Sequence, residues 1–164
     1  MFDPKHLIRT KKLTDADYAL IRHPLNPASE VRFSLLGDRV GMQRAHLSIA
    51  RLPPGKESFL PHAHFLQEEF VFILEGRGAA LIGETEVEVG PGDYMGFPTD
   101  GTVHHLRNVG ETDLVYLMGG ERTRTEVARF PSVGKVAVVD SSNVSFFDEA
   151  SAMVLSQERW LPKR

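Results

Sequence analysis

The sequence predicts an all-β domain in which short antiparallel strands form a barrel or sandwich. From about residue 40, short apolar or alternating runs recur, and each is followed by a cluster of turn residues. Runs of about 4–8 residues rich in Val, Ile, Phe and Tyr are typical of strands when Gly and Pro separate them. The 164 residues are enough for one domain with its own core.

The predicted strands are four runs, each with the turn that ends it. They are RAHLSIARL before PPGK, FVFILE before GRG, AALIGETEVEV before GPGD, and DLVYLMG before GERT. The segment TEVARFPSVGKVAVVD adds a loop and a further strand. We therefore predict a barrel over residues 39–140, an N-terminal extension over 1–38 that packs on it, and a C-terminal extension over 141–164.

Each extension is expected to contain one short helix. LTDADYALIR (13–22) fits a helix capped by Thr14, because Thr is a favoured N-cap residue. DEASAMVLSQERW (148–160) has the apolar spacing of a short helix. The remainder of the N-terminal extension, with two prolines in HPLNPAS, is expected to be irregular.

Composition and charge favour a soluble cytoplasmic protein that binds neither nucleic acid nor membranes. The net charge of −3 and the pI near 6.2 provide no field that attracts nucleic acid or an anionic membrane. The absence of cysteine excludes disulfides, thiol catalysis and thiolate metal sites, and it fits a reducing compartment. MFDPKHLIRTKK lacks the apolar core of a secretory signal, and no apolar run approaches the ~18 residues of a membrane span.

The segment 69–75 has two apolar faces. Side chains alternate across a strand, so Val71 and Ile73 point into the barrel if Glu69 does. The three other apolar side chains then point outward: Phe70, Phe72 and Leu74. An uncovered apolar stripe of this size is unusual on a monomer, so the N-terminal extension, the C-terminal tail or a second subunit must cover it. We expect a homodimer.

Two histidines one residue apart precede that strand. His62 and His64 would share a strand face about 7 Å apart, close enough to converge on one ion. Glu68 or Glu69 can add a carboxylate, and His104 at the start of a later strand can add a third imidazole. A His-x-His pair alone is also compatible with two surface histidines beside a hydrophobic strand.

The residues around these histidines resemble the two motifs of the cupin superfamily. The first motif is matched, with one extra residue in its spacer, by Gly55, His62, His64, Glu69 and Gly76. The second is matched, again with one extra residue, by Gly92, Pro98, Gly101, His104 and Asn108. The resemblance implies a jelly-roll-like double-stranded β-helix of two antiparallel sheets, and it implies a homodimer.

The resemblance also implies one divalent metal ion held by His62, His64, Glu69 and His104. Three imidazoles and a carboxylate suit Mn, Fe, Co, Ni, Cu or Zn, and affinity order alone does not identify the metal. The motif's six-residue step to Gly76 favours Glu69 over its neighbour Glu68. In a six-coordinate ion, four protein ligands leave two positions for water, substrate or dioxygen.

Other polar and aromatic residues are assigned by strand phase and position. Tyr94, Met95 and Phe97 follow the PGD turn and are expected near the barrel mouth, with Tyr94 as the candidate proton-transfer residue. His46 and His105 are expected to point away from the core. Three cations near the motifs are interpreted as solvated surface charge: Lys56, Arg77 and Arg107.

A Lewis acid inside an apolar barrel favours small chelating molecules as substrates. One hypothesis is isomerisation of a polyoxygenated substrate, such as a sugar or sugar phosphate. The metal would stabilise an enediolate, and Tyr94 or a hydroxide at the metal would transfer the proton. A second hypothesis is a metal-dependent dioxygenase. A third is a non-catalytic module that binds a metal or small ligand.

Overall fold

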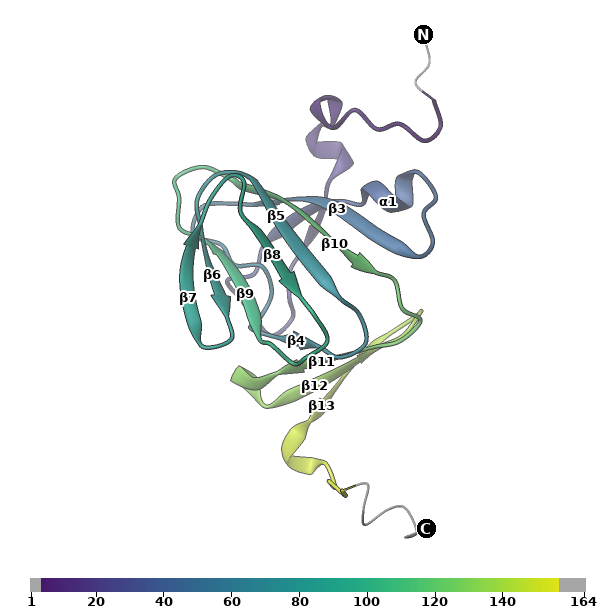
Figure 1. Ribbon diagram of the computed structural model, residues 1–164, viewed down its shortest axis with the longest axis vertical. Helices are drawn as coiled ribbons and strands as arrows, with labels where there is room; N and C mark the ends of the chain where they lie inside the picture. The colour runs from purple at the N-terminus through teal and green to yellow at the C-terminus, as the bar shows by residue number, and fades with distance from the viewer. Residues whose placement is uncertain (1–3, 157–164) are drawn as a thin grey trace.

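The computed structural model describes residues 4–156, and its architecture is a barrel of antiparallel strands (Figure 1). The strands are β1 (Ala19–Ile21), β2 (Val31–Ser34), β3 (Ala45–Leu52), β4 (Ala63–His64), β5 (Glu69–Glu75), β6 (Gly78–Ile82), β7 (Thr85–Val89), β8 (Tyr94–Phe97), β9 (His104–Asn108), β10 (Leu114–Glu121), β11 (Glu126–Phe130), β12 (Lys135–Val139) and β13 (Val144–Asp148). The α-helix α1 (Leu36–Arg39) is a single turn. The predicted all-β jelly-roll fold is confirmed.

Two layers of strands enclose the core. One layer is a six-stranded sheet in the order β1-β2-β3-β10-β5-β8. The other consists of a three-stranded sheet, β7-β6-β9, and a four-stranded sheet, β13-β12-β11-β4. A backbone bridge between His62 and His104 joins these two sheets where β4 approaches β9. The second layer is therefore continuous at the position of the two histidine motifs.

The strand phase of β5 agrees with the prediction. Val71 and Ile73 are buried in the core, and Glu69 points to the same side. The core cluster comprises Val31, Phe33, Ala50, Leu52, Val71, Ile73, Ala80, Val89, Met95, Phe97, Leu106, Leu114 and Tyr116. The chain turns after β5 at Gly76, which has φ +88°, and a Cβ there would lie 2.6 Å from the carbonyl oxygen of Asp113. Only glycine fits this turn, because both the conformation and the space exclude a side chain.

The strand phase of β3 differs from the expectation. Its inward side chains include Ser48, Ala50 and Leu52, which are almost fully buried. The expected apolar phase of Ala45, Leu47 and Ile49 faces outward instead, toward α1 and the N-terminal segment. His46 belongs to the inward set, so the prediction that it points away from the core is wrong. An apolar outer face that other elements cover gives the same sequence pattern as a core face.

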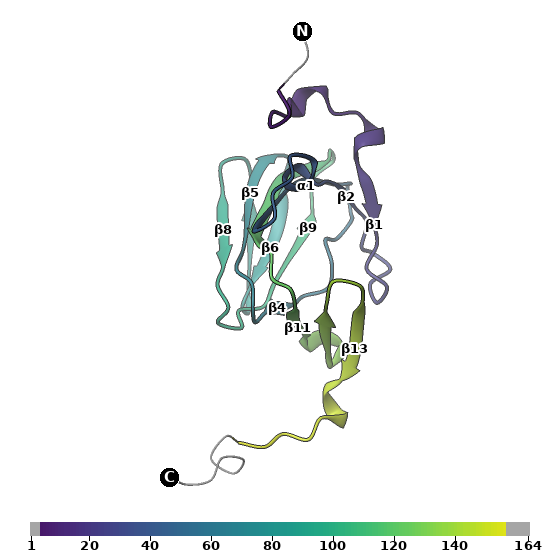
Figure 2. The ribbon, with the colours of Figure 1, turned by 90° about the vertical axis from the view of Figure 1, so that its right-hand side faces the viewer.

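The extensions are more closely integrated with the barrel than the predicted boundaries suggest. β1 and β2 lie within residues 1–38 and extend the large sheet through antiparallel pairing of β2 with β3. At the other end, β13 continues past residue 140 and pairs with β12. Figures 1 and 2 place the sheet of β11–β13 at one end of the barrel and the segment 4–17 at the opposite end.

Both predicted short helices are reduced to single 3₁₀ turns. Thr14 does cap the first turn, Asp15–Asp17, through a capping box with Asp17, but the chain then enters β1. At the C-terminal side the turn Glu149–Ser151 is followed by non-helical residues up to 156. The remainder of that predicted helix, residues 157–160, lies outside the described residues. Within residues 4–156, no helix has the length and apolar character needed to cross a membrane.

Candidate metal centre and its cavity

Three histidines from two neighbouring strands converge at the mouth of the barrel. His62 precedes β4, His64 ends it, and His104 begins β9. Their candidate ligand nitrogens all lie within 4.8 Å of one another, and all three residues are buried. The backbone bridge fixes this arrangement, because His62 N donates to His104 O at 3.1 Å and His104 N donates to His62 O at 2.8 Å. These three histidines could hold one metal ion.

Two of the three rings have Nδ1 atoms that are hydrogen-bonded away from the cluster, and Nδ1 of the third lies near a carboxylate. Nδ1 of His62 lies 2.7 Å from the carbonyl oxygen of Leu60, and Nδ1 of His104 lies 3.3 Å from that of Thr102. A carbonyl can only accept, so both rings carry their proton on Nδ1 when neutral. Nδ1 of His64 lies 3.5 Å from Oε1 of Glu126. The Nε2 lone pairs of such rings are free to bind a metal, as in many histidine metal sites.

The Glu69 carboxylate stands directly beside the imidazoles. Its Oε2 lies 3.5 Å from Nε2 of His64, and its Oε1 lies 3.6 Å from Nε2 of His104. Glu68 is exposed on the other side of the strand, where its backbone N–H donates to Glu121. The structure thus places Glu69, and not Glu68, next to the histidines.

Burial and mutual charge shift the pKa values in this cluster. Burial, assisted by the neighbouring His104, lowers the pKa of His62 to about 3. Burial also opposes the charged form of His64, but hydrogen bonds and charge from Glu69 and Glu126 outweigh it and raise the pKa. For Glu69 the burial effect would raise the pKa, yet the interactions with His104 and His64 keep it well below its usual range. The site therefore holds a carboxylate and at least one neutral imidazole at neutral pH.

The polar atoms of this cluster fit a bound cation. Nε2 of His64 and Nε2 of His104 are buried without a hydrogen-bond partner among the described residues. A buried polar atom left without a partner costs about 1–3 kcal/mol, so native proteins rarely retain several of them together. A divalent transition ion would accept both lone pairs and offset the charge of Glu69. The donor set therefore suits such a metal.

Glu126, the first residue of β11, supports His64 from behind. Its side chain is buried, and Oε1 accepts the backbone N–H groups of Phe65 at 2.9 Å and Leu66 at 3.3 Å. It therefore fixes both the ring of His64 and the turn after β4. No sequence pattern indicates this role, because Glu126 lies more than 60 residues from His64 and outside both motifs.

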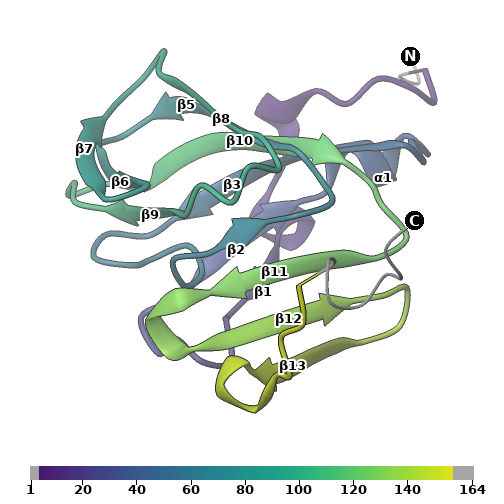
Figure 3. The same cartoon turned by 60° about the horizontal axis from the view of Figure 1, so that its bottom comes forward.

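A cavity of about 860 Å³ opens from the histidines toward the end of the barrel. Its far wall is the sheet of β11–β13, whose strands Figure 3 shows side by side, and β4 is the fourth strand of that sheet. One side is aromatic: Phe130 stacks on the ring of His62 at 5.6 Å and contacts His23 and Phe146 at 5.3 and 5.8 Å. The rim is cationic, with Arg22, Arg122 and Arg124 among its lining residues. The volume is typical of a small-molecule site.

Comparisons with known proteins agree with this architecture. The family model described as Cupin domain matches residues 48–120. An uncharacterised protein of Methanocaldococcus jannaschii is 30% identical over 110 residues, which is 66% of this chain and 86% of that protein. The chain belongs to the cupin family. The resemblance predicted from the two motifs is therefore confirmed.

Two solved cupin structures resemble this one over most of its length. One, from Acidithiobacillus ferrooxidans, is provisionally named a sugar phosphate isomerase; it is 29% identical, with a TM-score of 0.88 over 93% of this chain and 98% of the other. The second is a sugar phosphate isomerase of the cupin superfamily from Silicibacter pomeroyi, 28% identical, with a TM-score of 0.74 over 87% of this chain and 91% of the other.

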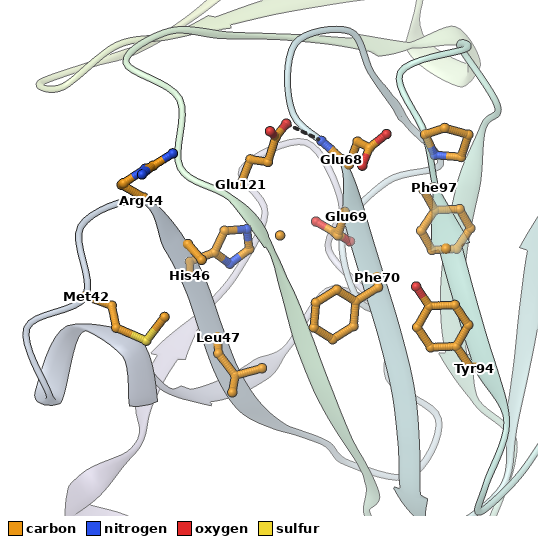
Figure 4. A pocket seen from close by; sticks show the side chains of 14 residues that line it. Met42, Arg44, His46, Leu47, Glu68, Glu69, Phe70, Tyr94, Phe97 and Glu121 are labelled. Carbon is orange, nitrogen blue, oxygen red and sulfur yellow. Dashed lines mark hydrogen bonds between the residues drawn. The ribbon is translucent and has the colours of Figure 1, made fainter. Parts of the chain in front are cut away.

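Tyr94 is not among the groups around the histidines of this cupin. Its side chain is 65% exposed and packs beside Phe70 on the outer face of the large sheet, in a groove of about 660 Å³ (Figure 4). Met95 and Phe97, which alternate with it, are the inward residues, and Phe97 stacks on His104 at 3.9 Å. The expectation that Tyr94 faces the site is wrong, because β8 pairs with β5 in the register that turns odd-numbered residues inward.

His46 points toward the cavity, and not away from the core as its sequence pattern predicted. It lies on β3, lines the same cavity as the three histidines, and has its ring turned toward Glu69 (Figure 4). Burial is the main cause that lowers its pKa, which favours a neutral imidazole at neutral pH. Side chains alternate along β3, so inward-facing Ala50 and Leu52 imply that His46 also faces inward.

His105 is also placed differently from the expectation. It is buried rather than a surface side chain, and its Nε2 lies 3.5 Å from Oε2 of Glu57. The three cations interpreted as surface charge do lie outside this cavity, in ion pairs with Glu30, Glu88 and Glu86: Lys56, Arg77 and Arg107.

Proposed function

We propose that this cupin is a metal-dependent isomerase of a small polyoxygenated substrate, and that the substrate is a phosphorylated sugar. The observation that carries the proposal is the convergence of three imidazoles and Glu69 on the floor of a cavity with a cationic rim. The two similar structures named as sugar phosphate isomerases support it. No redox partner or second substrate is needed for this reaction.

In this proposal, His62, His64, Glu69 and His104 hold one divalent ion. Such an ion would supply positive charge to neighbouring oxygens of the substrate. Glu126 keeps the ring of His64 in place, as outer carboxylates do in many histidine metal sites. The aromatic side of the cavity excludes water from the carbon skeleton.

Proton transfer is assigned to His46, because Tyr94 lies outside the cavity. A neutral imidazole can take the proton from the carbon next to the carbonyl group and return it to the neighbouring carbon. The electrons of the broken C–H bond form a C=C bond while the carbonyl electrons move onto the carbonyl oxygen, which takes up the proton of the neighbouring hydroxyl group. When the proton on His46 is returned to the former carbonyl carbon, the C=C electrons form its new C–H bond and the other oxygen becomes the carbonyl. Glu69 is then free to act as a ligand, and the aldose and ketose interconvert without net oxidation.

The metal site is tested by elemental analysis of protein purified without chelators. His62→Ala and His104→Ala should remove most of the bound metal while the circular dichroism spectrum stays that of the wild type. His105→Asn is the matched control on the same strand, and it should retain the metal because its ring faces Glu57. Unchanged metal content in both alanine variants would refute the ligand assignment.

The isomerase reaction is tested by NMR in D₂O with aldose and ketose phosphates. Wild-type protein loaded with metal should incorporate deuterium at the carbon next to the carbonyl and interconvert the two sugars. His46→Gln should lower kcat at least a hundredfold with little change in KM, since general base catalysis contributes about 10²–10⁴-fold. Oxygen consumption with any of these substrates, without isomerisation, would instead favour the dioxygenase hypothesis.

A further inference from the structure

The connection between β10 and β11 contributes three consecutive residues to the cavity rim. Arg122, Thr123 and Arg124 all line the cavity that holds the candidate metal ligands. They lie just after residue 120, where the match to the cupin family model ends. They belong to neither of the two cupin motifs, but their side chains line the cavity.

Thr123 has a buried hydroxyl without a partner. Its Oγ1 is inaccessible to solvent and forms no hydrogen bond with the described residues. A hydroxyl in this state costs free energy unless a ligand or a water satisfies it. Because the residue lines the cavity, a ligand group that accepts a hydrogen bond would relieve that cost.

The two arginines differ in how their charge is compensated. Arg122 forms an ion pair with Asp38 in α1, and this pair orients its side chain. Arg124 is exposed and forms no ion pair or hydrogen bond within residues 4–156. Its guanidinium therefore carries uncompensated charge at the rim. Guanidinium groups bind phosphate through paired N–H donors, which suits them to recognition of phosphate esters.

The carboxylates near this segment do not cancel that charge. Asp140 also lines the cavity, but it accepts the backbone N–H groups of Ser142 and Asn143 within its own turn. Glu126 is occupied by the amides after β4, and Glu69 belongs to the histidine cluster. The rim therefore remains favourable to an anion on the side of Arg124.

The strand register relates this segment to the metal centre. His64 pairs with Ala128 on β11, and Arg124 precedes Ala128 by four residues. Four residues span at most about 14 Å, which bounds the distance from Arg124 to Ala128, and Arg124 and the histidines line the same cavity. A molecule held at both positions needs oxygens at one end and an anionic group at the other.

We propose that Arg124, Thr123 and Arg122 form a phosphate subsite, which makes a phosphate monoester the anionic end of the substrate. This inference rests on the proposed function for the metal end of the same cavity. Arg124 and Arg122 donate to the phosphate oxygens, and the hydroxyl of Thr123 donates a further hydrogen bond. The aromatic side, with Phe130 and Phe146, lies along the carbon skeleton between the two ends.

The subsite is tested by titration of inorganic phosphate into the full-length protein, followed by amide chemical shifts in NMR. The amides of Arg122–Arg124 should shift and saturate in the wild type. Arg124→Gln should weaken phosphate binding at least tenfold, and Thr123→Val should weaken it by a smaller factor. Asp140→Asn should strengthen it, because a nearby negative charge is removed.

Arg129→Gln is the matched control. Arg129 is an exposed arginine on β11 that pairs with Glu149 and does not line the cavity. Equal phosphate binding in Arg124→Gln and wild type, or an equal loss in Arg129→Gln, would overturn the proposal. Arg124 is exposed and has no hydrogen bond or ion pair with the described part of the chain, so its replacement is not expected to impair folding.

A second measurement separates this inference from the proposed function. His62→Ala without metal should still bind phosphate within about twofold of the wild type, and Arg124→Gln should still bind the metal fully. If phosphate binds as proposed but no sugar phosphate is isomerised, the isomerase proposal fails and the subsite stands. If sugar phosphates are isomerised equally well by Arg124→Gln, the subsite fails and the isomerase stands.

Discussion

Glu68 and Glu69 are neighbours in the chain, but their surroundings are opposite. Glu69 lies within 3.6 Å of two imidazoles, whereas Glu68 is exposed beside Glu121. The difference follows from the alternation of side chains along β5, which also buries Val71 and Ile73. A comparison of two glutamine variants therefore tests the strand phase and the metal chemistry together.

We predict that Glu69→Gln weakens metal affinity at least tenfold, or about 1.4 kcal/mol. The reason is that an amide does not offset the charge of a divalent ion. Glu68→Gln, the matched control, should change the affinity less than twofold. Both variants are titrated with the same metal at one pH by isothermal calorimetry. A larger loss of metal affinity in Glu68→Gln would show that Glu68, and not Glu69, is the ligand.

A second prediction concerns the pH dependence of stability in the metal-free protein. The pKa of His62 is about 3 in the folded state and 6.5 ordinarily, so the unfolded state binds the proton first as the pH falls. Stability should therefore decrease as the pH falls from about 6.5 toward 3, with a slope of up to about 1.4 kcal/mol per pH unit. The raised pKa of His64 affects stability only above about pH 6.5, where its contribution is lost as the pH rises, so it leaves the slope in this window unchanged.

His62→Asn should remove this contribution and flatten the pH profile. The measurement is urea unfolding in the presence of a chelator at several pH values between 7 and 4. His6→Asn, an exposed histidine in the N-terminal segment, is the control and should leave the profile unchanged. Parallel profiles for wild type and His62→Asn would show that His62 titrates normally in the folded protein.

At the scale of elements, the two-residue strand β4 depends on β11. β4 is too short to be recognised from its own sequence, and its pairing with β11 fixes the direction of His64. Glu126 adds a buried carboxylate that accepts the amides of Phe65 and Leu66. The candidate metal site is thus completed by a strand that comes from a distant part of the chain.

We predict that Glu126→Gln reduces metal affinity about tenfold, because outer carboxylates typically contribute 10–100-fold. The amide can still accept from the backbone, so the fold should persist, but it no longer stabilises positive charge on His64. Glu149→Gln, an exposed residue paired with Arg129, is the control. Metal affinity measured by competition with a chromophoric chelator distinguishes the two. Equal affinity in Glu126→Gln and wild type would contradict this role.

The sequence was sufficient to predict the elements that have local patterns. The inward phase of β5, the cap at Thr14 and the cupin motifs depend on neighbours within a few residues. The phase of β3 was misjudged, and Tyr94 was expected near the barrel mouth, because only strand pairing decides which side chains of β3 and β8 point inward. His46, Glu126 and Arg124 were missed for a related reason, since long-range packing brings them to the cavity.

At the scale of the whole molecule, the outer face of the large sheet is covered unevenly. The N-terminal segment, with Tyr18, lies over the end that carries Ile49 and Leu74. The opposite end forms the groove of Figure 4, where Tyr94 is 65% and Met42 is 43% exposed. An exposed apolar groove with charged residues along it, among them Arg44, Glu68 and Glu121, has the composition of a subunit interface.

We predict a homodimer that uses this groove. Sedimentation at micromolar concentration should give about twice the chain mass of 18.3 kDa. Tyr94→Glu should dissociate the dimer, because it places a charge in the middle of the apolar surface. Val87→Glu, on β7 in the other layer, is 39% exposed and serves as the control. A monomeric wild type, or equal dissociation by both variants, would contradict the interface.

The residues that line the cavity of this cupin come from two parts of the chain. All four proposed ligands lie within residues 48–120, which match the family model, whereas Arg22, Arg124 and Phe146 lie outside it. Mutations in the terminal strands can therefore change what the cavity accepts while the ligand set stays intact. Descent with modification would then produce proteins that share one metal chemistry and differ in substrate. Sequence differences in the terminal segments, more than differences in the motifs, would then account for differences in substrate among such proteins.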